Sequence, residues 1–232
     1  MLFTASNLFK SFYHRPVLDD LSFSIRQGEM VALMGKNGAG KSTLLRIIAG
    51  LTSMDRGTVT VNGQTLKSGN PDARDGILYL GHSPGMYAQL TAVENLSFAM
   101  KLYREPENYD LINDTLGNLK LANQSTEPIH VYSQGMLQRL KLALAQVIHW
   151  KLLLFDEPLN GLDVAGQSLV DGVINEWNEK ERTMLLVVHD IDWAIENCQH
   201  ILLLHKGKIE LKLSCAEADK SATKMTALRV LQ

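Results

Sequence analysis

The stretch "ALMGKNGAGKSTLLRIIAGL" at residues 32–51 decides the fold of this chain. It connects a continuous apolar run, "MVALM", to a run with helix-spaced apolar residues through a glycine-rich loop. The loop reads G-x-x-x-x-G-K-S, and it lies between a buried strand and a helix, where that pattern binds phosphate. We therefore predict a parallel α/β core with a phosphate-binding loop at residues 35–42.

Each residue type in this loop has a physical reason. Glycines let backbone N–H groups turn toward phosphate oxygens, and the helix start adds a favourable dipole. Lys41 would place its charge on the β- and γ-phosphates, and the Ser42 hydroxyl is a hard oxygen ligand for Mg²⁺. The alternative, a glycine-rich turn of no special function, is disfavoured because both the spacing and the context match. The predicted nucleotide-binding residues are Gly35, Lys36, Asn37, Gly38, Ala39, Gly40, Lys41, Ser42 and Thr43.

A second acidic site is expected at the end of another buried strand, and "LLLFDEP" at residues 152–158 supplies it. Asp156 could hold Mg²⁺ through water, and Glu157 could orient or deprotonate an attacking water. Without the phosphate loop, the same pair would more often mark a strand that ends at the surface. Together the two motifs predict metal ligation by Ser42 and Asp156.

The remaining pattern predicts how the chain is organised. Short strands fill the first thirty residues, Asn62-Gly63 marks a hairpin, and residues 90–145 have a helical pattern. Strands and helices then alternate to a closing hairpin, with a helix expected at 164–181. We expect one domain at residues 1–215 with a helical subdomain at about 88–145, and a C-terminal tail at 216–232 of unknown role.

Composition narrows the function classes. The 232 residues include 23 Lys and Arg against 25 Asp and Glu, so no basic footprint for nucleic acid is present. No apolar run reaches the ~18 residues of a membrane span, so direct membrane insertion is not expected. The start of the chain has no signal-peptide pattern, and Cys198 and Cys215 lack metal-ligand spacing.

Over residues 2–213, the order of motifs resembles the nucleotide-binding subunit of ATP-binding-cassette (ABC) transporters. The resemblance implies a P-loop NTPase (RecA-like) parallel-sheet core with an N-terminal antiparallel β-subdomain and an inserted α-helical subdomain. The motifs that carry it are an aromatic at Phe12, the phosphate loop, "LTAVENL" at 90–96, "YSQGM" at 132–136, "LLLFDEP", the "NGLD" loop that ends at Asp163, and His189 after a strand.

The resemblance implies an ATPase that uses ATP and Mg²⁺. Phe12, rather than the neighbouring Tyr13, would stack on adenine. Glu157 and His189 would be catalytic, with His189 contacting the γ-phosphate and helping to hold water against Glu157. A histidine that ends an apolar strand is otherwise more often structural.

The resemblance also implies that half of each ATP site comes from a second copy of the chain. Ser133, Gln134 and Gly135 open a helix, and they would bind the γ-phosphate that the partner holds. Asp163 would act at the dimer seam as the D-loop residue. An ordinary helix cap is the alternative for "YSQG", and Asp163 can also be a helix N-cap.

Two departures from the family pattern stand out. The signature reads YSQGM where LSGGQ is common, so we expect weaker or differently tuned dimer closure. His82 occupies the Q-loop position, where the family has glutamine, and its charge can vary near neutral pH. The segment "YLGH-x-PG" followed by "LTA-x-ENL" is similar to the ATPase subunit of the bacterial haem exporter of cytochrome c biogenesis.

We therefore predict an ATPase subunit that powers separate integral-membrane transporter subunits, as an exporter of the haem type. It would lie in the cytoplasm, peripheral on the inner face of the cell membrane. The alternatives are an exporter of another substrate such as a drug or sodium, a soluble ATPase of iron–sulfur assembly, and a module that binds ATP and hardly hydrolyses it. The sequence contains no recognisable haem-binding residues, so it does not identify the substrate.

Overall fold

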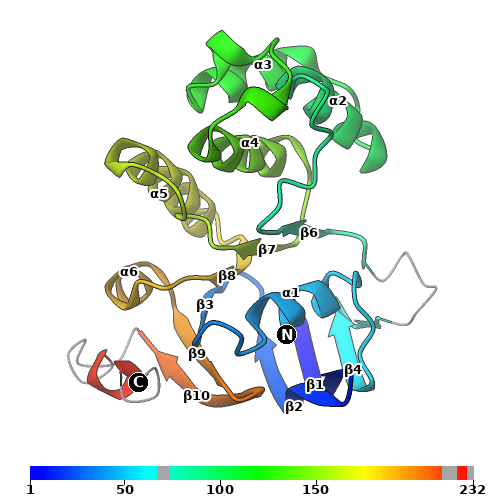
Figure 1. The fold of residues 1–232 in the computed structure, drawn as a ribbon, viewed down its shortest axis with the longest axis vertical. Helices are drawn as coiled ribbons and strands as arrows, with labels where there is room; N and C mark the ends of the chain where they lie inside the picture. Colours follow the sequence, from blue (N-terminus) through cyan, green and yellow to red (C-terminus); the bar gives the residue numbers. More distant parts are fainter. Residues whose placement is uncertain (67–73, 216–223, 229–232) are drawn as a thin grey trace. The chain divides into compact units, whose positions relative to one another are not determined.

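The computed structural model describes residues 1–66, 74–215 and 224–228 (Figure 1). The predicted C-terminal tail therefore lies outside the described residues, apart from 224–228. The chain forms two compact units. The first consists of Met1–Tyr79, Lys151–Glu157 and Trp177–Gln232, and the second consists of Leu80–Trp150 and Pro158–Glu176.

An antiparallel sheet in the first unit has the strand order β2-β1-β4-β5. Its strands are β1 (Phe3–Phe12), β2 (Arg15–Ile25), β4 (Arg56–Val61) and β5 (Gln64–Thr65). The predicted hairpin at Asn62-Gly63 joins β4 to β5, and both turn residues have positive φ, 51° and 76°. Asparagine and glycine accept this left-handed backbone most easily, so the prediction is confirmed together with its cause.

The larger sheet has the strand order β10-β9-β3-β8-β7-β6. Strand β3 is parallel to β8 and β9, β7 is parallel to β8, and β10 pairs antiparallel to β9. All residues of β3, β7 and β8 are buried, as their continuous apolar sequences predict. The strands are β3 (Met30–Met34), β6 (Ile77–Leu80), β7 (Leu152–Asp156), β8 (Thr183–Val187), β9 (His200–His205) and β10 (Lys208–Ser214).

The core of the first unit is shared by the two sheets and helix α1 (Lys41–Ile48) (Figure 1). Leu44, Leu45 and Ile48 of this helix are fully buried beside apolar residues of both sheets. Burying side chains of this size contributes about 1.5–3 kcal/mol each, so the core fixes the helix directly after the glycine-rich loop. Helix α6 (Ile191–Asn197) follows β8, and Asp190 caps it by accepting from the backbone N–H of Asp192 and Trp193.

The second unit is helical. It contains α2 (Ala92–Leu102), α3 (Tyr109–Asn118), α4 (Gln134–Val147), most of α5 (Val164–Glu179) and the short 3₁₀ turns η2 (Ala122–Gln124) and η3 (Ile129–Val131). Thr91 and Glu94 form a capping box at the start of α2. Helix α5 ends two residues before the predicted 181, since Glu181 adopts a left-handed φ of 53°.

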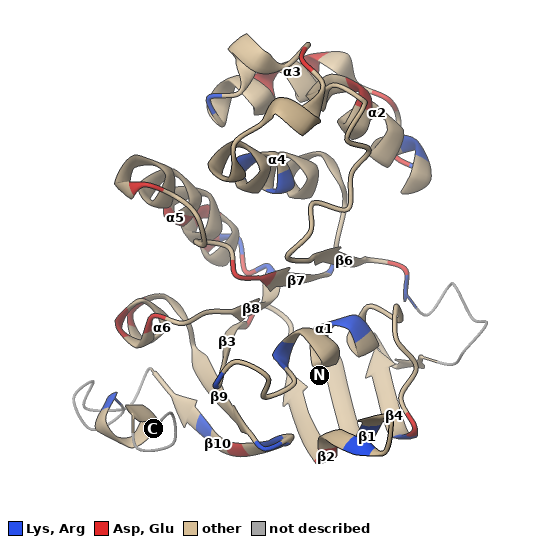
Figure 2. Ribbon diagram, viewed as in Figure 1, with Lys and Arg blue, Asp and Glu red and all other residues tan. Residues whose placement is uncertain are grey.

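The predicted α/β architecture is therefore confirmed: a largely parallel core sheet, an antiparallel sheet near the N-terminus and inserted helices. Basic and acidic residues are interspersed in both units (Figure 2). Across the described part of the chain, no helix has both the length and the apolar character needed to cross a membrane.

Candidate functional site

The glycine-rich loop leaves the carboxyl end of β3 and enters α1. At Gly35, a Cβ atom would lie 2.3 Å from the carbonyl oxygen of Leu204, so no larger residue fits. Gly40 occupies the N-cap of α1 with φ 106°, a conformation that L side chains rarely adopt. No side chain caps this helix, so its first-turn N–H groups are left for another acceptor.

Lys41 lies inside the loop and is 7% exposed. Its Nζ donates to the carbonyl oxygen of Gly35 at 2.7 Å and to that of Lys36 at 3.1 Å. Burial lowers the pKa of Lys41, while Glu157 and Asp156 oppose this by favouring the charged form. The loop therefore presents an ammonium group held by backbone, next to the exposed hydroxyl-bearing Ser42.

Three loops of this unit meet at one edge of the larger sheet. Strands β3, β8 and β7 are neighbours and parallel, and Val187 pairs with both Leu33 and Asp156. Because the carboxyl ends of parallel strands share one edge, Asp156 at the end of β7 lies there together with Gly35 and His189, which follow β3 and β8. Asp156 is 3% exposed. Burial of Tyr79 is the main cause that raises the pKa of this tyrosine, and the negative charge of Asp156 is the second.

Glu157 and His189 form a hydrogen-bonded pair. The Nε2 atom of His189 lies 2.7 Å from Oε1 of Glu157. Glu157 has a left-handed φ of 56°, and its N–H donates to the carbonyl oxygen of Val187 at 3.1 Å. Such backbone strain costs roughly 1–3 kcal/mol in a residue with a side chain, and it is typical of functional sites.

The predicted magnesium ligands fit the metal's chemistry. Mg²⁺ prefers oxygen ligands and keeps several waters, so one carboxylate and one hydroxyl beside substrate phosphates are enough. Asp156 and Ser42 supply these two groups. Among the residues that the structure describes, no group of three or more His, Cys, Asp or Glu could hold a metal ion by itself.

Phe12, the predicted adenine-stacking residue, ends β1 and is 41% exposed. The neighbouring Tyr13 is 97% exposed in the turn that follows. The Nζ atom of Lys10 lies 5.1 Å from the ring centroid of Phe12 and pairs with Asp55 at 2.9 Å. The sequence analysis did not identify Lys10, although its i, i+2 spacing from Phe12 on a strand places both on one face.

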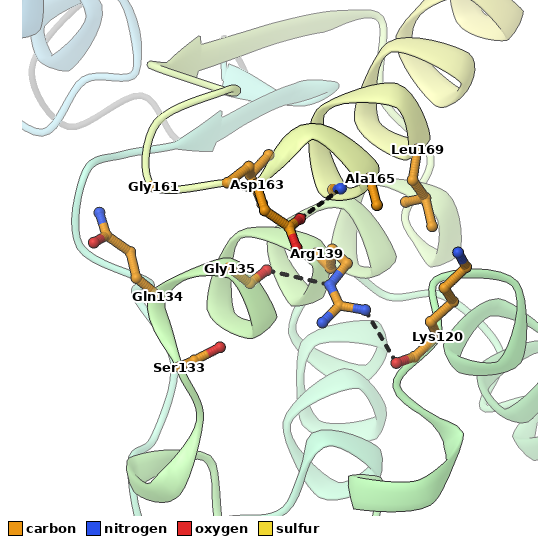
Figure 3. Close-up of a pocket in the computed structure, with 11 residues that line it drawn as sticks. Lys120, Ser133, Gln134, Gly135, Arg139, Gly161, Asp163, Ala165 and Leu169 are labelled. Atoms are coloured by element: carbon orange, nitrogen blue, oxygen red, sulfur yellow. Dashed lines mark hydrogen bonds between the residues drawn. The ribbon is translucent and has the colours of Figure 1, made fainter.

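The remaining predicted residues belong to the second unit. A cavity of about 540 Å³ is lined by the start of α4 and the start of α5 (Figure 3). Ser133 caps α4 by accepting from the N–H of Met136 at 3.2 Å, and Asp163 accepts from the N–H of Gly166 at 2.8 Å. The helix-cap interpretation of both residues is therefore confirmed, whereas their role toward a second copy stays a prediction.

Gln134 and Gly161 pack closely within the same cavity. A Cβ atom on Gly161 would lie 2.5 Å from Cδ of Gln134, and Gly161 has a left-handed φ of 74°. Gln134 is one of the three residues at which YSQGM departs from the common LSGGQ signature. Its amide therefore occupies the space that a side chain at position 161 would need. Arg139 donates to the carbonyl oxygens of Gly135 and Lys120 on the other side of the cavity (Figure 3). It also donates to the carbonyl oxygen of Leu119.

His82 lies in an irregular, exposed loop after β6 and does not line this cavity. The carbonyl oxygens of Gly81 and His82 accept from Lys141, which the sequence analysis did not identify. Within the first unit, the structure brings together the phosphate loop, Asp156, Glu157 and His189. Within the second unit, it brings together Ser133, Gln134, Gly135 and Asp163.

Comparison with known sequences gives consistent matches. The family described as "ABC transporter" matches residues 18–160. The chain is 36% identical over 191 residues to the cytochrome c biogenesis ATP-binding export protein CcmA of Nitrosomonas europaea, which covers 82% of this chain and 89% of that protein. It is 35% identical over 216 residues to the phosphonates import ATP-binding protein PhnC 2 of Nostoc sp., with 87% of each chain covered.

Solved structures show the same fold. An ATP-binding subunit of an ABC transporter superposes with a TM-score of 0.86 at 29% identity, over 98% of this chain and 94% of the other. A dimeric post-hydrolysis state of the ATP-binding cassette MJ0796, bound to ADP and Pi, superposes with a TM-score of 0.85 at 24% identity, over 93% and 100%. The second match is evidence for the fold alone.

Proposed function

We propose that this chain, which belongs to the family of ABC transporter ATP-binding subunits, works as a dimer that powers separate membrane subunits. As a member of that family, it is an ATPase. The observation that carries the ATPase chemistry of this proposal is the pairing of Glu157 with His189 at 2.7 Å, beside a glycine loop that holds a buried lysine.

The phosphate loop would bind the nucleotide. The first-turn N–H groups of α1 and the ammonium of Lys41 would hold the β- and γ-phosphates, and Phe12 would stack on the adenine. Ser42 and Asp156 would hold Mg²⁺, which when bound offsets the negative charge of the phosphates. Lys41 would have to exchange its present carbonyl acceptors, or share them, with phosphate oxygens.

Glu157 would position and deprotonate the water that attacks the γ-phosphate. A general base must lie within hydrogen-bond reach of the water, and its side chain must be fixed. His189 helps to fix it, because its Nε2 atom contacts Oε1 of the carboxylate at 2.7 Å. Glu157 also has a left-handed backbone, a strained conformation that clusters at functional sites.

The dimer would complete each site. Ser133, Gln134 and Gly135 of one copy would bind the γ-phosphate held by the other, with Asp163 at the seam. MJ0796, which has this fold, forms a dimer, and this supports the proposed arrangement. His82 would stand where the family's glutamine senses the metal and water.

For the transported substrate, we propose haem export of the cytochrome c biogenesis type, from the cytoplasmic face of the cell membrane. The 36% identity to CcmA and the histidine at position 82 support this. The nearly equal identity to PhnC 2, an import protein by name, shows why the ATPase alone does not decide the cargo. Purification from detergent-solubilised membranes would test the assignment to a transporter. A transporter ATPase should copurify with integral-membrane subunits, and copurification of soluble partners alone would contradict the assignment.

Glu157→Gln tests the catalytic assignment. We expect ATP binding to be retained and kcat to fall by about 10²–10⁴-fold, the usual contribution of a general base. Glu196→Gln is the matched control, because Glu196 is an exposed carboxylate on α6, and it should keep wild-type turnover. Unchanged hydrolysis in Glu157→Gln would show that the water is activated by another group.

A further inference from the structure

Lys141 is a buried cation in the middle of α4, with 3% of its surface exposed. Its neighbours along the helix, Leu140 and Leu142, are fully buried. An ammonium group taken out of water is strongly destabilising unless hydrogen-bond acceptors surround it. The contacts of Lys141 therefore explain why a lysine lies on the buried face of this helix.

Three acceptors surround the Nζ atom of Lys141. It donates to the carbonyl oxygen of Gly81 at 2.7 Å, to that of His82 at 2.9 Å and to Oε1 of Gln138 at 3.2 Å. The first two acceptors belong to an irregular loop, in which Gly81 and His82 are part of no helix or strand. Charge-assisted hydrogen bonds are about twice as strong as neutral ones, so Lys141 ties this loop to α4.

Gln138 extends the connection in the other direction. It is 4% exposed, and its Nε2 donates to the carbonyl oxygen of Pro158 at 2.7 Å. Pro158 is bonded directly to Glu157 in the sequence. One buried pair on α4 thus holds both the His82 loop and the first residue after the catalytic carboxylate.

We propose that Lys141, acting with Gln138, is a positioning residue that fixes the His82 loop to the helix that begins at the signature. The inference rests on the proposed role of His82. Lys141 lies eight residues after Ser133, roughly 12 Å along the helix axis. Any displacement of α4 at its signature end is therefore transmitted to the carbonyls of Gly81 and His82 through a rigid helix and short hydrogen bonds.

The chemistry explains the choice of lysine. Backbone carbonyls need a donor, and a helix offers none from its own backbone in its middle turns. A flexible four-carbon stem can bring one ammonium to acceptors on two elements at once. A neutral apolar residue of the same length, methionine, would fill the space and leave those oxygens without this donor.

Hydrogen exchange on the nucleotide-free protein tests the positioning directly. We expect the amides of residues 81–87, other than Pro84, to exchange about 10–100-fold faster in Lys141→Met than in wild type, because charge-assisted bonds are lost. Lys101→Met is the matched control, because Lys101 is an exposed helical lysine of the same unit. In this variant, the amides of residues 81–87 should exchange as in wild type. Unchanged exchange at 81–87 in folded Lys141→Met would overturn the proposal.

If Lys141→Met does not fold, Lys141→Gln is the second variant, since it keeps a donor for one carbonyl. It should show a smaller increase in exchange at the same residues. Unchanged exchange at 81–87 in that variant would likewise count against Lys141.

Turnover separates positioning from a purely structural role. Lys141→Met should lower kcat by about tenfold with little change in KM, and it should have no further effect in a His82→Ala background. An equal loss of kcat in both backgrounds would show that Lys141 does not act through His82. If wild type shows no ATPase activity, or His82→Ala leaves kcat unchanged, the proposed function or the role of His82 fails. The exchange comparison still decides the positioning in both cases.

Discussion

Replacing Lys41 by methionine should leave the nucleotide-free protein nearly as stable as wild type and should remove most of its response to ATP. In the structure, burial lowers the pKa of Lys41, so the folded protein holds this ammonium less favourably than water does. Methionine keeps the buried stem and avoids the cost of burying the charge. It loses the bonds to the carbonyl oxygens of Gly35 and Lys36, at 2.7 and 3.1 Å. These two effects oppose each other, and we expect a net change within about 1 kcal/mol.

With nucleotide bound, the two effects no longer cancel. Hydrogen bonds to charged groups contribute about 1.5–3 kcal/mol each, so the loss of contacts to two phosphates should cost about 3 kcal/mol or more. This corresponds to an increase in Kd of about 100-fold. At an ATP concentration of 100 times the wild-type Kd, binding stabilises wild type by about 2.7 kcal/mol and the variant by about 0.4 kcal/mol.

Thermal unfolding with and without MgATP measures this difference. For a chain of this size, about 1 kcal/mol shifts Tm by about 2–4 °C, so ATP should raise Tm by about 5–10 °C in wild type and by about 1 °C in Lys41→Met. Lys212→Met, at an exposed lysine of β10, is the control and should respond like wild type. An ATP-induced shift in Lys41→Met equal to that of wild type would refute the assignment of Lys41 to the phosphates.

Two further predictions concern the second unit. Hydrogen bonds from Ser97, Tyr109 and Lys101 lower the pKa of Glu107 to about 2. Since the folded-state pKa lies below the unfolded one, this stabilisation is complete above about pH 4.5. It is lost as the pH falls toward 2, so Glu107→Gln should flatten the decline of Tm between pH 5 and 2.5, and parallel curves would contradict this. Gly161→Ala should lower the unfolding free energy by about 1–3 kcal/mol, because φ is 74° and Cβ would overlap Gln134. Urea unfolding should show that Gln134→Ala restores part of this loss, and strict additivity would exclude the overlap.

The local sequence predicts the phosphate loop and its flanking elements because every signal lies within twenty residues. Strand β3, the glycines and α1 follow from an apolar run, a spacing and a helical period. The contact between Glu157 and His189 has another origin, since it depends on β7 and β8 being parallel neighbours in the larger sheet. No local pattern specifies this strand order, and only the resemblance of the whole motif series anticipated it.

The backbone of Glu157 contradicts a local rule. A residue before proline is expected to be extended, yet Glu157 precedes Pro158 with a φ of 56°. The structure supplies the compensation through the N–H bond to Val187 and the side-chain bond to His189. Lys141 was missed for another reason: a lone charge within "RLKLALA" is visible in the sequence, but its acceptors lie about sixty residues earlier in the chain.

The capping of the helices distinguishes the two halves of the proposed ATP site. Side chains cap α2, α3, α4 and α6, through Thr91, Asn108, Ser133 and Asp190, whereas Gly40 leaves the start of α1 without a side-chain cap. The first-turn N–H groups of α1 are thus the ones most in need of an acceptor, and a phosphate satisfies them.

At α4, Ser133 already accepts from the N–H of Met136, and its hydroxyl hydrogen can still be donated to an incoming anion. At the signature half, one first-turn N–H already has a side-chain acceptor, and the others would be available to the γ-phosphate presented by a second copy.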